Sequence, residues 1–464
     1  MRANADLSEN KMGVMPVGKL LWVMSWPAML SMLIHSLYNV VDSIFLAAVS
    51  EDALTAVTLA FPIQMLLIAF GAGTGIGINS LIARRLGAKR LEEANLAASV
   101  GFRLSFFGGV VFAAFGLFFS GRYIRMFSDH PYTVESGTSY LTVVCVCSVF
   151  VLTVMSVEKI MQATGNMVAP MICSLTGAAV NIALDPIFIF GLFGVPRLEV
   201  LGAAIATVIG QFVSLCLGLT FLFTKTRDVR VRLSGFPMSR QTIKDIYAVG
   251  LPAILMQCIG SVMLFFLNGI LAAISSTAVA VLGAYFRLQS FIFLPVIGIM
   301  QGAMPILGYN FGAGNKKRLM TTFQRAFGAS LALMVFGLIL FQVFPRQLLA
   351  MFSASAQMLA IGIPALRLVS LCFPAAAFGI MASTLFQATG HGMLSLWGNL
   401  IRALLGVVPL AWLLAGTANG AFWVWAAFPL AEALAVVYCL IALRHIYRKK
   451  IAPLTPRLPQ NEDV

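Results

Sequence analysis

The stretch that decides the fold is residues 169–193, which read A-P-M-I-C-S-L-T-G-A-A-V-N-I-A-L-D-P-I-F-I-F-G-L-F. Its only charged residue is Asp185. A transmembrane helix needs roughly 20 predominantly apolar residues, so this stretch is long enough to cross a bilayer. A charged side chain inside a bilayer is costly and is by default a candidate for function. The stretch therefore predicts a membrane-spanning helix that carries a functional carboxylate.

Segments of the same kind occur along the whole chain. Hydrophobic residues make up 60% of the 464 residues and charged residues only 10%, whereas a soluble domain carries about 25% charged residues. Open sheets cannot cross lipid, and the apolar runs are too continuous for the alternating pattern of a membrane barrel. The sequence therefore predicts an all-α integral membrane protein with twelve transmembrane helices. We place them near 20–48, 55–83, 96–119, 136–157, 169–193, 202–223, 246–274, 279–308, 320–343, 359–383, 396–415 and 421–443.

The net charge of +14 comes from short basic clusters between the apolar runs. No basic groove-binding module is present, so we expect no nucleic-acid partner. An excess of Lys and Arg on cytoplasmic segments orients membrane proteins, and this rule predicts that both termini are cytoplasmic. The clusters on the predicted cytoplasmic side are Arg84, Arg85, Lys89 and Arg90, the stretch 225–244, and residues 316–318.

The chain also repeats itself with a gapless offset of 225 residues. The offset aligns Gln162-Ala163-Thr164-Gly165 with Gln387-Ala388-Thr389-Gly390, Pro27 with Pro252, Gly73 with Gly298, and Gly77 with Gly302. Each copy holds six spans, which predicts two parallel repeats related by an axis along the membrane normal, around a central cleft. The predicted division is an N-terminal segment 1–19, an N-lobe 20–223, a linker 224–245, a C-lobe 246–443 and a basic tail 444–464.

Two aspartates lie well inside predicted spans. Asn181 and Asp185 are four residues apart, so they share one helical face. In the first span, Asp42 shares a face with Asn39 and Tyr38 in the same way. The 225 offset places leucines opposite both aspartates in the second copy. The ion chemistry is therefore predicted to be asymmetric between the two lobes.

Pro186 follows Asp185 directly. Proline has no N–H, so the Ile182 carbonyl loses its helical partner and the helix should kink beside the carboxylate. Carboxylate, carboxamide and carbonyl oxygens together suit a proton or a hard cation such as Na⁺. The alternative is that Asp185 makes only a structural hydrogen bond or salt bridge between helices. The residues alone leave both roles open.

Other intramembrane residues give weaker signals. Small residues at four-residue spacing, such as Gly73 and Gly77, predict close helix approach rather than a phosphate loop. The charged residues Arg287, Arg367, Arg402 and Glu432 either pair with one another or reach an interface. Polar and thioether side chains that face a cleft could contact a varied substrate. The candidate cleft residues are Tyr38, Asn39, Gln64, Met256, Gln257 and Gln289.

No catalytic or cofactor constellation accompanies these residues. The seven cysteines lie in apolar runs without metal-ligand spacing. No nucleophile with a base, no His/Cys cluster and no nucleotide-binding loop of the G-x-x-x-x-G-K-[ST] type is present. We therefore expect no enzyme, no cofactor and no metal beyond Na⁺ as a transported ion.

Several motifs resemble the multidrug and toxic compound extrusion (MATE) family. They are Y-N-V-V-D-S-I-F-L at 38–46, N-I-A-L-D-P-I-F-I-F-G at 181–191, G-A-A-I-A-T at 202–207, and the paired Q-A-T-G segments. The similarity covers the chain from about Leu20 to Tyr447. One branch of the family carries acidic residues in the seventh and tenth spans, where this chain has Gln257 and no carboxylate. The bacterial DinF-like or MepA-like branch therefore fits better.

The resemblance implies a monomeric antiporter in the bacterial cytoplasmic membrane. Such a protein exchanges H⁺ or Na⁺ for organic, often cationic, drugs by alternating access. The family's N-lobe cation site falls on Asp42, Asn181, Asp185 and Thr207. Membrane lipid is the remaining expected partner.

Two other classes of function stay open. A lipid-linked saccharide flippase resembles this superfamily in its repeated helices, but it is expected to need a more cationic cleft for pyrophosphate than this acidic first lobe provides. A membrane-embedded enzyme is disfavoured because the catalytic constellation is missing.

Overall fold

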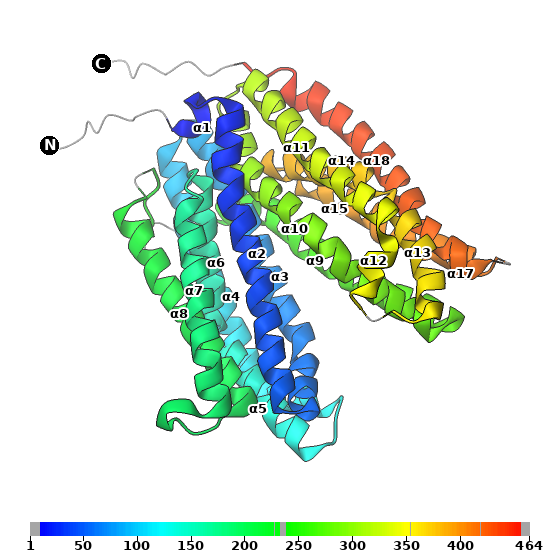
Figure 1. The fold of residues 1–464 in the computed structure, drawn as a ribbon. Coiled ribbons are helices and arrows are strands. Elements are labelled where there is room, and N and C mark those ends of the chain that lie inside the picture. The colour runs from blue at the N-terminus through cyan, green and yellow to red at the C-terminus, as the bar shows by residue number, and fades with distance from the viewer. Residues whose placement is uncertain (1–9, 227, 233–237, 353, 418, 456–464) are drawn as a thin grey trace, which may run out of the picture. The chain divides into compact units, whose positions relative to one another are not determined.

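The computed structural model describes residues 10–226, 228–232, 238–352, 354–417 and 419–455. All regular secondary structure in these ranges is helical. The described residues fall into two compact units (Figure 1). The first unit contains Asn10 and the described residues of Leu30–Gly250. The second contains Lys11–Met29 and the described residues from Leu251 onward.

The helices follow the chain in two series. The first series is α1 (Lys11–Val14), α2 (Val17–Val49), α3 (Glu51–Gly87), α4 (Leu91–Arg125), α5 (Pro131–Val146), α6 (Ser148–Ala163), α7 (Val168–Phe190), the 3₁₀ turn η1 (Leu192–Gly194) and α8 (Glu199–Thr224). The second is α9 (Arg240–Ile274), α10 (Ser276–Gly312), α11 (Lys316–Val343), α12 (Pro345–Ala350), α13 (Ala356–Ser370), α14 (Phe373–Ala388), α15 (Gly392–Leu400), η2 (Ile401–Val407), α16 (Val408–Ala415), α17 (Gly420–Trp423), η3 (Val424–Ala426), α18 (Ala427–Ile446) and η4 (Tyr447–Ile451).

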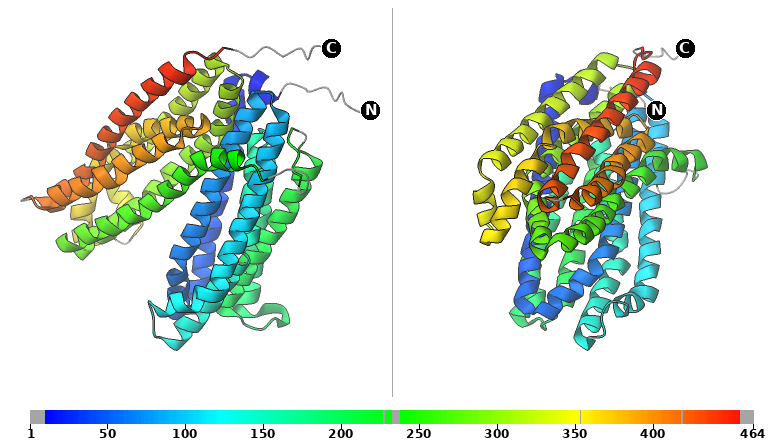
Figure 2. Two further views of the ribbon diagram at one scale, coloured as in Figure 1. Left: turned by 180° about the vertical axis from the view of Figure 1, so that it is seen from behind. Right: turned by 90° about the vertical axis from the view of Figure 1, so that its right-hand side faces the viewer.

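The predicted number of membrane spans agrees with these helices. Among the described residues, 10 helices are long and apolar enough to cross a membrane, with α15 to α16 and α17 to η4 each counted as one. Two further spans are bent pairs, α5 with α6 at 43° and α13 with α14 at 46°. With each pair counted as one span, the total is 12. The helices α4, α6, α7 and α8, cyan to green, run alongside one another in the first unit (Figure 1, Figure 2).

The predicted internal repeat is confirmed by the boundaries of the helices. Helices α3 and α10 both have 37 residues, and each begins after a serine whose side chain caps the first turn, Ser50 in one and Ser275 in the other. Helices α6 and α14 both have 16 residues. Each is followed by a glycine with positive φ, 90° at Gly165 and 89° at Gly390. The Q-A-T-G segments therefore end equivalent helices with the same left-handed turn.

The first long helix of each series, α2 and α9, changes unit near a proline. The chain passes from the second unit to the first after Met29, close to Pro27 in α2, and passes back after Gly250, close to Pro252 in α9. Glycine lets the backbones approach where the first part of α2 packs on α10. A Cβ atom on Gly302 would lie 2.6 Å from Ser25 Oγ and 2.9 Å from Ser25 Cα. At Gly77, one of the glycines predicted to allow close approach, a Cβ atom would lie 2.2 Å from the carbonyl oxygen of Ile246 in α9, so the prediction is confirmed at this residue.

A packed core holds together the helices that carry the predicted first-lobe site. It includes Leu46 of α2, Tyr140 of α5, Ile189 of α7 and Val200 of α8, each at most 3% exposed. In lipid, helix association depends on such van der Waals packing rather than on exclusion of water. The core therefore fixes α2 and α7 relative to each other beside their aspartates.

The second unit has an aromatic core. The ring of Phe341 makes edge contacts with Tyr285, at a centroid distance of 6.4 Å, and with Phe373, at 5.2 Å. All three side chains are fully or almost fully buried. These contacts join α10, α11 and α14, so they hold the bent α13–α14 span against its neighbours.

An ion pair also lies inside the second unit. Glu432 of α18 is 4% exposed, and its Oε2 lies 3.9 Å from Nη1 of Arg402 in the π-helix η2. Arg402 also donates to Asn399 Oδ1 at 2.8 Å, whereas Glu432 Oε1 is buried without a hydrogen-bond partner. Of the two roles predicted for these intramembrane charges, pairing is the one observed for Arg402 and Glu432.

Substitution of Gly302 should test the helix crossing. We expect Gly302→Ala to destabilise the purified protein by about 1–3 kcal/mol, because the new methyl group meets the α2 backbone. Gly283→Ala in the same helix is the control, since a Cβ there meets nothing within 4 Å. Thermal unfolding in detergent measures both. An equal response of the two variants would contradict the crossing.

The ion pair predicts an unequal effect of its two partners. Arg402→Gln leaves a buried carboxylate without its cation, whereas Glu432→Gln leaves an arginine whose side chain is 35% exposed and can reach a polar surface. We therefore expect Arg402→Gln to lower the unfolding temperature more than Glu432→Gln does. The reverse order would show that the pair does not compensate Glu432 in the folded protein.

Candidate cation site

Helix α7 positions the two residues at the centre of the site. Asn181 is 3% exposed and Asp185 is 0% exposed. Their four-residue spacing places them one turn apart on the same face, and Asn181 Nδ2 donates to Asp185 Oδ1 at 3.2 Å. The predicted shared face is therefore confirmed as a direct hydrogen bond.

Thr207 reaches this pair from the neighbouring helix. Asn181 Nδ2 also donates to Thr207 Oγ1 of α8, at 3.4 Å. The two helices approach closely because Gly210 lies opposite Asn181, where an added Cβ would be 3.3 Å from the Asn181 Cβ. One carboxamide therefore connects a hydroxyl on α8 with a carboxylate on α7.

Helix α2 contributes the second carboxylate. Asp42 interacts electrostatically with Asp185, and both carboxylates act on Tyr38 and Tyr140. All of these residues belong to the first unit. The structure thus brings Asp42 and Tyr38 of α2 into the electrostatic surroundings of Asp185. The side chain of Asn39 lies outside the described residues.

Gln64 belongs to the same surroundings through a residue that the sequence did not single out. Its Nε2 donates to the hydroxyl of Tyr140 at 2.9 Å. Tyr140, on α5, is 3% exposed. A polar aromatic residue inside an apolar span was the available signal, but only the fold shows that Tyr140 faces the site rather than lipid.

Three oxygen atoms of the site have no hydrogen-bond partner. They are Asp42 Oδ1, Asn181 Oδ1 and Asp185 Oδ2, all buried. A buried acceptor without a partner costs roughly 1–3 kcal/mol, and oxygen atoms of this kind are the ligands that hard cations prefer. The site therefore offers oxygen atoms from two carboxylates, a carboxamide and a hydroxyl. Such a set of atoms can bind a proton or a small cation.

Helix α7 is not interrupted after the carboxylate. It contains Pro186 and continues to Phe190, where Gly191 ends it with φ 76°. The kink expected beside Asp185 stays a prediction. Because Gly191 follows so soon, the carboxylate lies near the end of its helix.

The remaining predicted cleft residues lie in the second unit. The backbone carbonyl of Met256 accepts a hydrogen bond from Asn399 Nδ2 at 3.3 Å, the side chain of Gln257 is exposed, and Gln289 is partly exposed on α10. Among the other intramembrane charges, Arg367 donates to the Gln342 carbonyl at 3.2 Å. These contacts do not test a role in substrate binding.

A family model supports the resemblance seen in the sequence. The model described as MatE matches this chain twice, over residues 27–187 and 252–413. The two matches together cover more than half of the chain and begin 225 residues apart, as the internal repeat does. The family model therefore matches both halves of the chain.

Known proteins of similar length give the same assignment. The multidrug export protein MepA of Staphylococcus haemolyticus is 26% identical over 369 residues, which are 79% of this chain and 80% of that protein. The FAD transporter of Shewanella oneidensis is 26% identical over 401 residues, which are 85% and 88% of the two chains. A solved structure of a multidrug resistance MATE family transporter of the MOP superfamily, in its outward-facing conformation, is 29% identical, covers 97% of this chain and 99% of its own, and has a TM-score of 0.88. This chain therefore belongs to the MatE family of multi-pass membrane transporters.

Proposed function

We propose that this protein is a cation-coupled antiporter that exports organic, often cationic, compounds. The observation that carries the proposal is the polar cluster of Asp42, Asn181, Asp185 and Thr207 in a transporter fold, in which Asn181 and Asp185 are buried and Asp42 and Thr207 are partly buried. MepA, the multidrug export protein among the relatives, supports export of drugs as the cargo. The protein acts in a bacterial cytoplasmic membrane with both termini cytoplasmic, as a monomer.

The coupling step is the binding of H⁺ or Na⁺ between the two carboxylates. Without a bound cation, Asp42 and Asp185 carry like charges in a poorly solvated site, which is unfavourable. A proton or cation relieves that repulsion, and the amide of Asn181 keeps Asp185 oriented toward it. Binding therefore changes the packing preference of α2 against α7.

Alternating access follows if ion and cargo favour different arrangements of the helices. A ligand shifts a conformational equilibrium only by its difference in affinity for the two states. An organic cation that enters the site competes with H⁺ or Na⁺ for the same carboxylates. Export of the organic cation is thereby coupled to uptake of H⁺ or Na⁺.

The cargo contacts are proposed to extend beyond the carboxylates. Tyr38 and Gln64 lie near them in the first unit, and Asn39, Met256, Gln257 and Gln289 are proposed to complete the binding surface. An aromatic ring such as that of Tyr38 can stabilise a cation at its face. Thioether and amide groups adapt to cargo of varied shape.

A second candidate is export of an anionic aromatic compound. The relative described as an FAD transporter favours it, and so does the scarcity of acidic residues in the second unit, where Glu432 is the only carboxylate among the described residues. A transport panel that contains both organic cations and flavin nucleotides separates the two candidates.

Substitution of Asp185 should remove coupling. We expect Asp185→Asn to lower efflux of ethidium from cells at least tenfold, because the site loses the charge that attracts the ion. Asp129→Asn is the matched control, since this aspartate is exposed outside the helices and should leave efflux unchanged. Undiminished, gradient-dependent efflux by Asp185→Asn at equal expression would remove Asp185 from the mechanism.

Substitution of Thr207 should identify the ion. Thr207→Val keeps the shape of the side chain and removes the hydroxyl that accepts from Asn181. In proteoliposomes with independently imposed pH and Na⁺ gradients, we expect the ion that drives transport to bind roughly tenfold more weakly, the equivalent of about 1.4 kcal/mol. A wild-type response to both gradients would show that Thr207 is not part of the cation site.

A further inference from the structure

The second unit has an unusual balance of charge. Glu432 is the only carboxylate among its described residues, and it is buried against Arg402. The acids Glu462 and Asp463 lie outside the described residues. Its Lys and Arg side chains at the membrane surface therefore have no acidic partner within the described part of the unit.

One of the two runs of three consecutive cations in this unit is at the start of α11. Lys316, Lys317 and Arg318 form the first turn of this helix. The N-terminus of a helix carries a partial positive charge that repels cations and attracts anions. Three cations in the first turn are therefore electrostatically unfavourable unless an anion binds there.

The equivalent turn of the first repeat carries the opposite charge. Helix α4 begins with Leu91, Glu92 and Glu93, the residues 225 positions before 316–318. Glu93 pairs with Arg85 at 2.8 Å and with Arg90 at 3.3 Å. The first repeat thus neutralises this turn internally, as the helix dipole favours, whereas the second does not.

Arg318 is already engaged by the protein. It donates to the carbonyl oxygens of Met12 at 3.0 Å and Met15 at 2.8 Å, which holds the chain segment before α2 against α11. The two lysines have no ion pair in the described residues.

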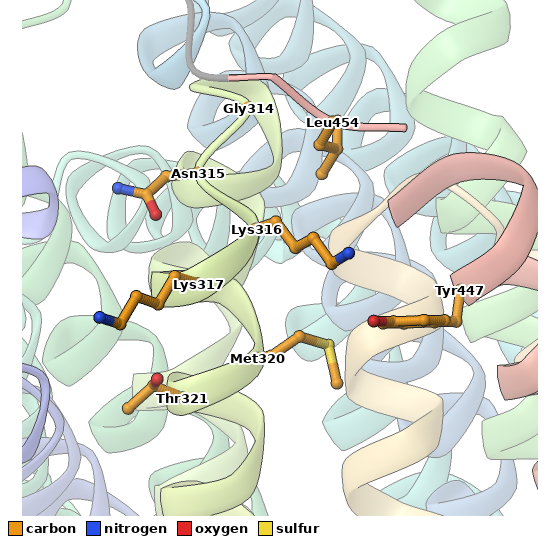
Figure 3. A pocket seen from close by; sticks show the side chains of 8 residues that line it. All are labelled: Gly314, Asn315, Lys316, Lys317, Met320, Thr321, Tyr447 and Leu454. Atoms are coloured by element: carbon orange, nitrogen blue, oxygen red, sulfur yellow. The ribbon is translucent and has the colours of Figure 1, made fainter. Parts of the chain in front are cut away.

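A cavity of about 430 Å³ opens beside this turn. It is lined by Gly314, Asn315, Lys316, Lys317, Met320, Thr321, Tyr447 and Leu454 (Figure 3). Lys316 and Met320 extend toward Tyr447, while Lys317 extends to the other side of α11 (Figure 3). The ammonium group of Lys316 lies 5.2 Å from the centre of the Tyr447 ring.

The far wall of the cavity comes from the end of the last helix. Tyr447 begins the π-helix η4, whose next residues are Arg448, Lys449 and Lys450, all exposed. Basic residues at the end of a helix agree with its dipole, but here they add to the positive field of the α11 turn. The cavity therefore lies between the basic first turn of α11 and the residue that precedes a second basic run.

We propose that this cavity binds the phosphate headgroup of an anionic phospholipid. Lys316 and the Tyr447 hydroxyl supply donors for phosphate oxygens. Met320, further along α11 than Lys316, supplies an apolar wall for the start of the acyl chains (Figure 3). Basic pockets between transmembrane helices are known to favour such headgroups, and tyrosine is enriched at the same depth of the membrane.

The apolar wall favours a lipid over inorganic phosphate. Free phosphate has no apolar part, so it gains nothing from Met320. A phospholipid places its phosphate and its acyl chains on the two kinds of surface at once. Bound there, it would hold α11 and the end of α18 together, and with them the segment fixed by Arg318.

Detergent-purified full-length protein tests the proposal. Phosphatidylglycerol, phosphatidylcholine and inorganic phosphate are added separately, and adducts are counted by native mass spectrometry together with the thermal unfolding midpoint. We expect phosphatidylglycerol to bind and to raise the midpoint. Lys316→Gln should weaken its binding about fivefold, the equivalent of about 1 kcal/mol for one basic residue, and Tyr447→Phe should weaken it less.

Lys225→Gln is the matched control, because Lys225 also lies over an aromatic ring, 5.0 Å from the centre of Phe221, at a helix end of the first unit. It should bind phosphatidylglycerol as the wild type does. Equal binding by Lys316→Gln and wild type, or an equal loss in Lys225→Gln, would overturn the site. Binding of inorganic phosphate as strong as that of phosphatidylglycerol would overturn the lipid as its ligand. Tyr447→Phe keeps the test valid if Lys316→Gln fails to fold.

Discussion

The structure depends on the cost of placing a polar group in lipid. Each backbone donor and acceptor that crosses the membrane has to be paired within the protein, which is why the described residues fold only into helices. The same cost applies to side chains. Asp185 is 0% exposed, yet only its Oδ1 accepts a hydrogen bond, from the Asn181 carboxamide, while its Oδ2 has no partner, so the fold retains a carboxyl group that simple packing would exclude. A residue kept at such a cost is the strongest available indication of function.

The two repeats use this constraint differently. Their helices begin and end at equivalent positions, so backbone and capping are shared. The first unit places its buried acids in a cluster with free oxygen atoms, which can exchange a cation. The second unit buries one acid against Arg402, and that pair already supplies its own counter-charge. Duplication thus preserved the scaffold while the polar residues diverged.

The sequence alone predicted the features that depend on a local pattern of residues. Apolar length predicted the spans, and the offset of 225 predicted the repeat and its close helix contacts. The four-residue spacing predicted that Asn181 and Asp185 share a face. The contact of Thr207 with Asn181 came from family resemblance, because residues on different helices have no spacing that relates them. Tyr140 and the exchange of the first parts of α2 and α9 between units depend on tertiary packing, which a single sequence does not encode in any local signal.

The uneven distribution of charge gives the asymmetry a physical consequence. Acids are concentrated in the first unit, where two of them lie together in a membrane-embedded site, while the second unit carries almost only bases. The candidate cation site therefore belongs to the unit that holds all but one of the described carboxylates. In the second unit the one described carboxylate, Glu432, lies against Arg402, so the described acids of that unit cannot build a second site of the same kind. The ion chemistry is thus asymmetric because the acids are distributed asymmetrically over a duplicated scaffold.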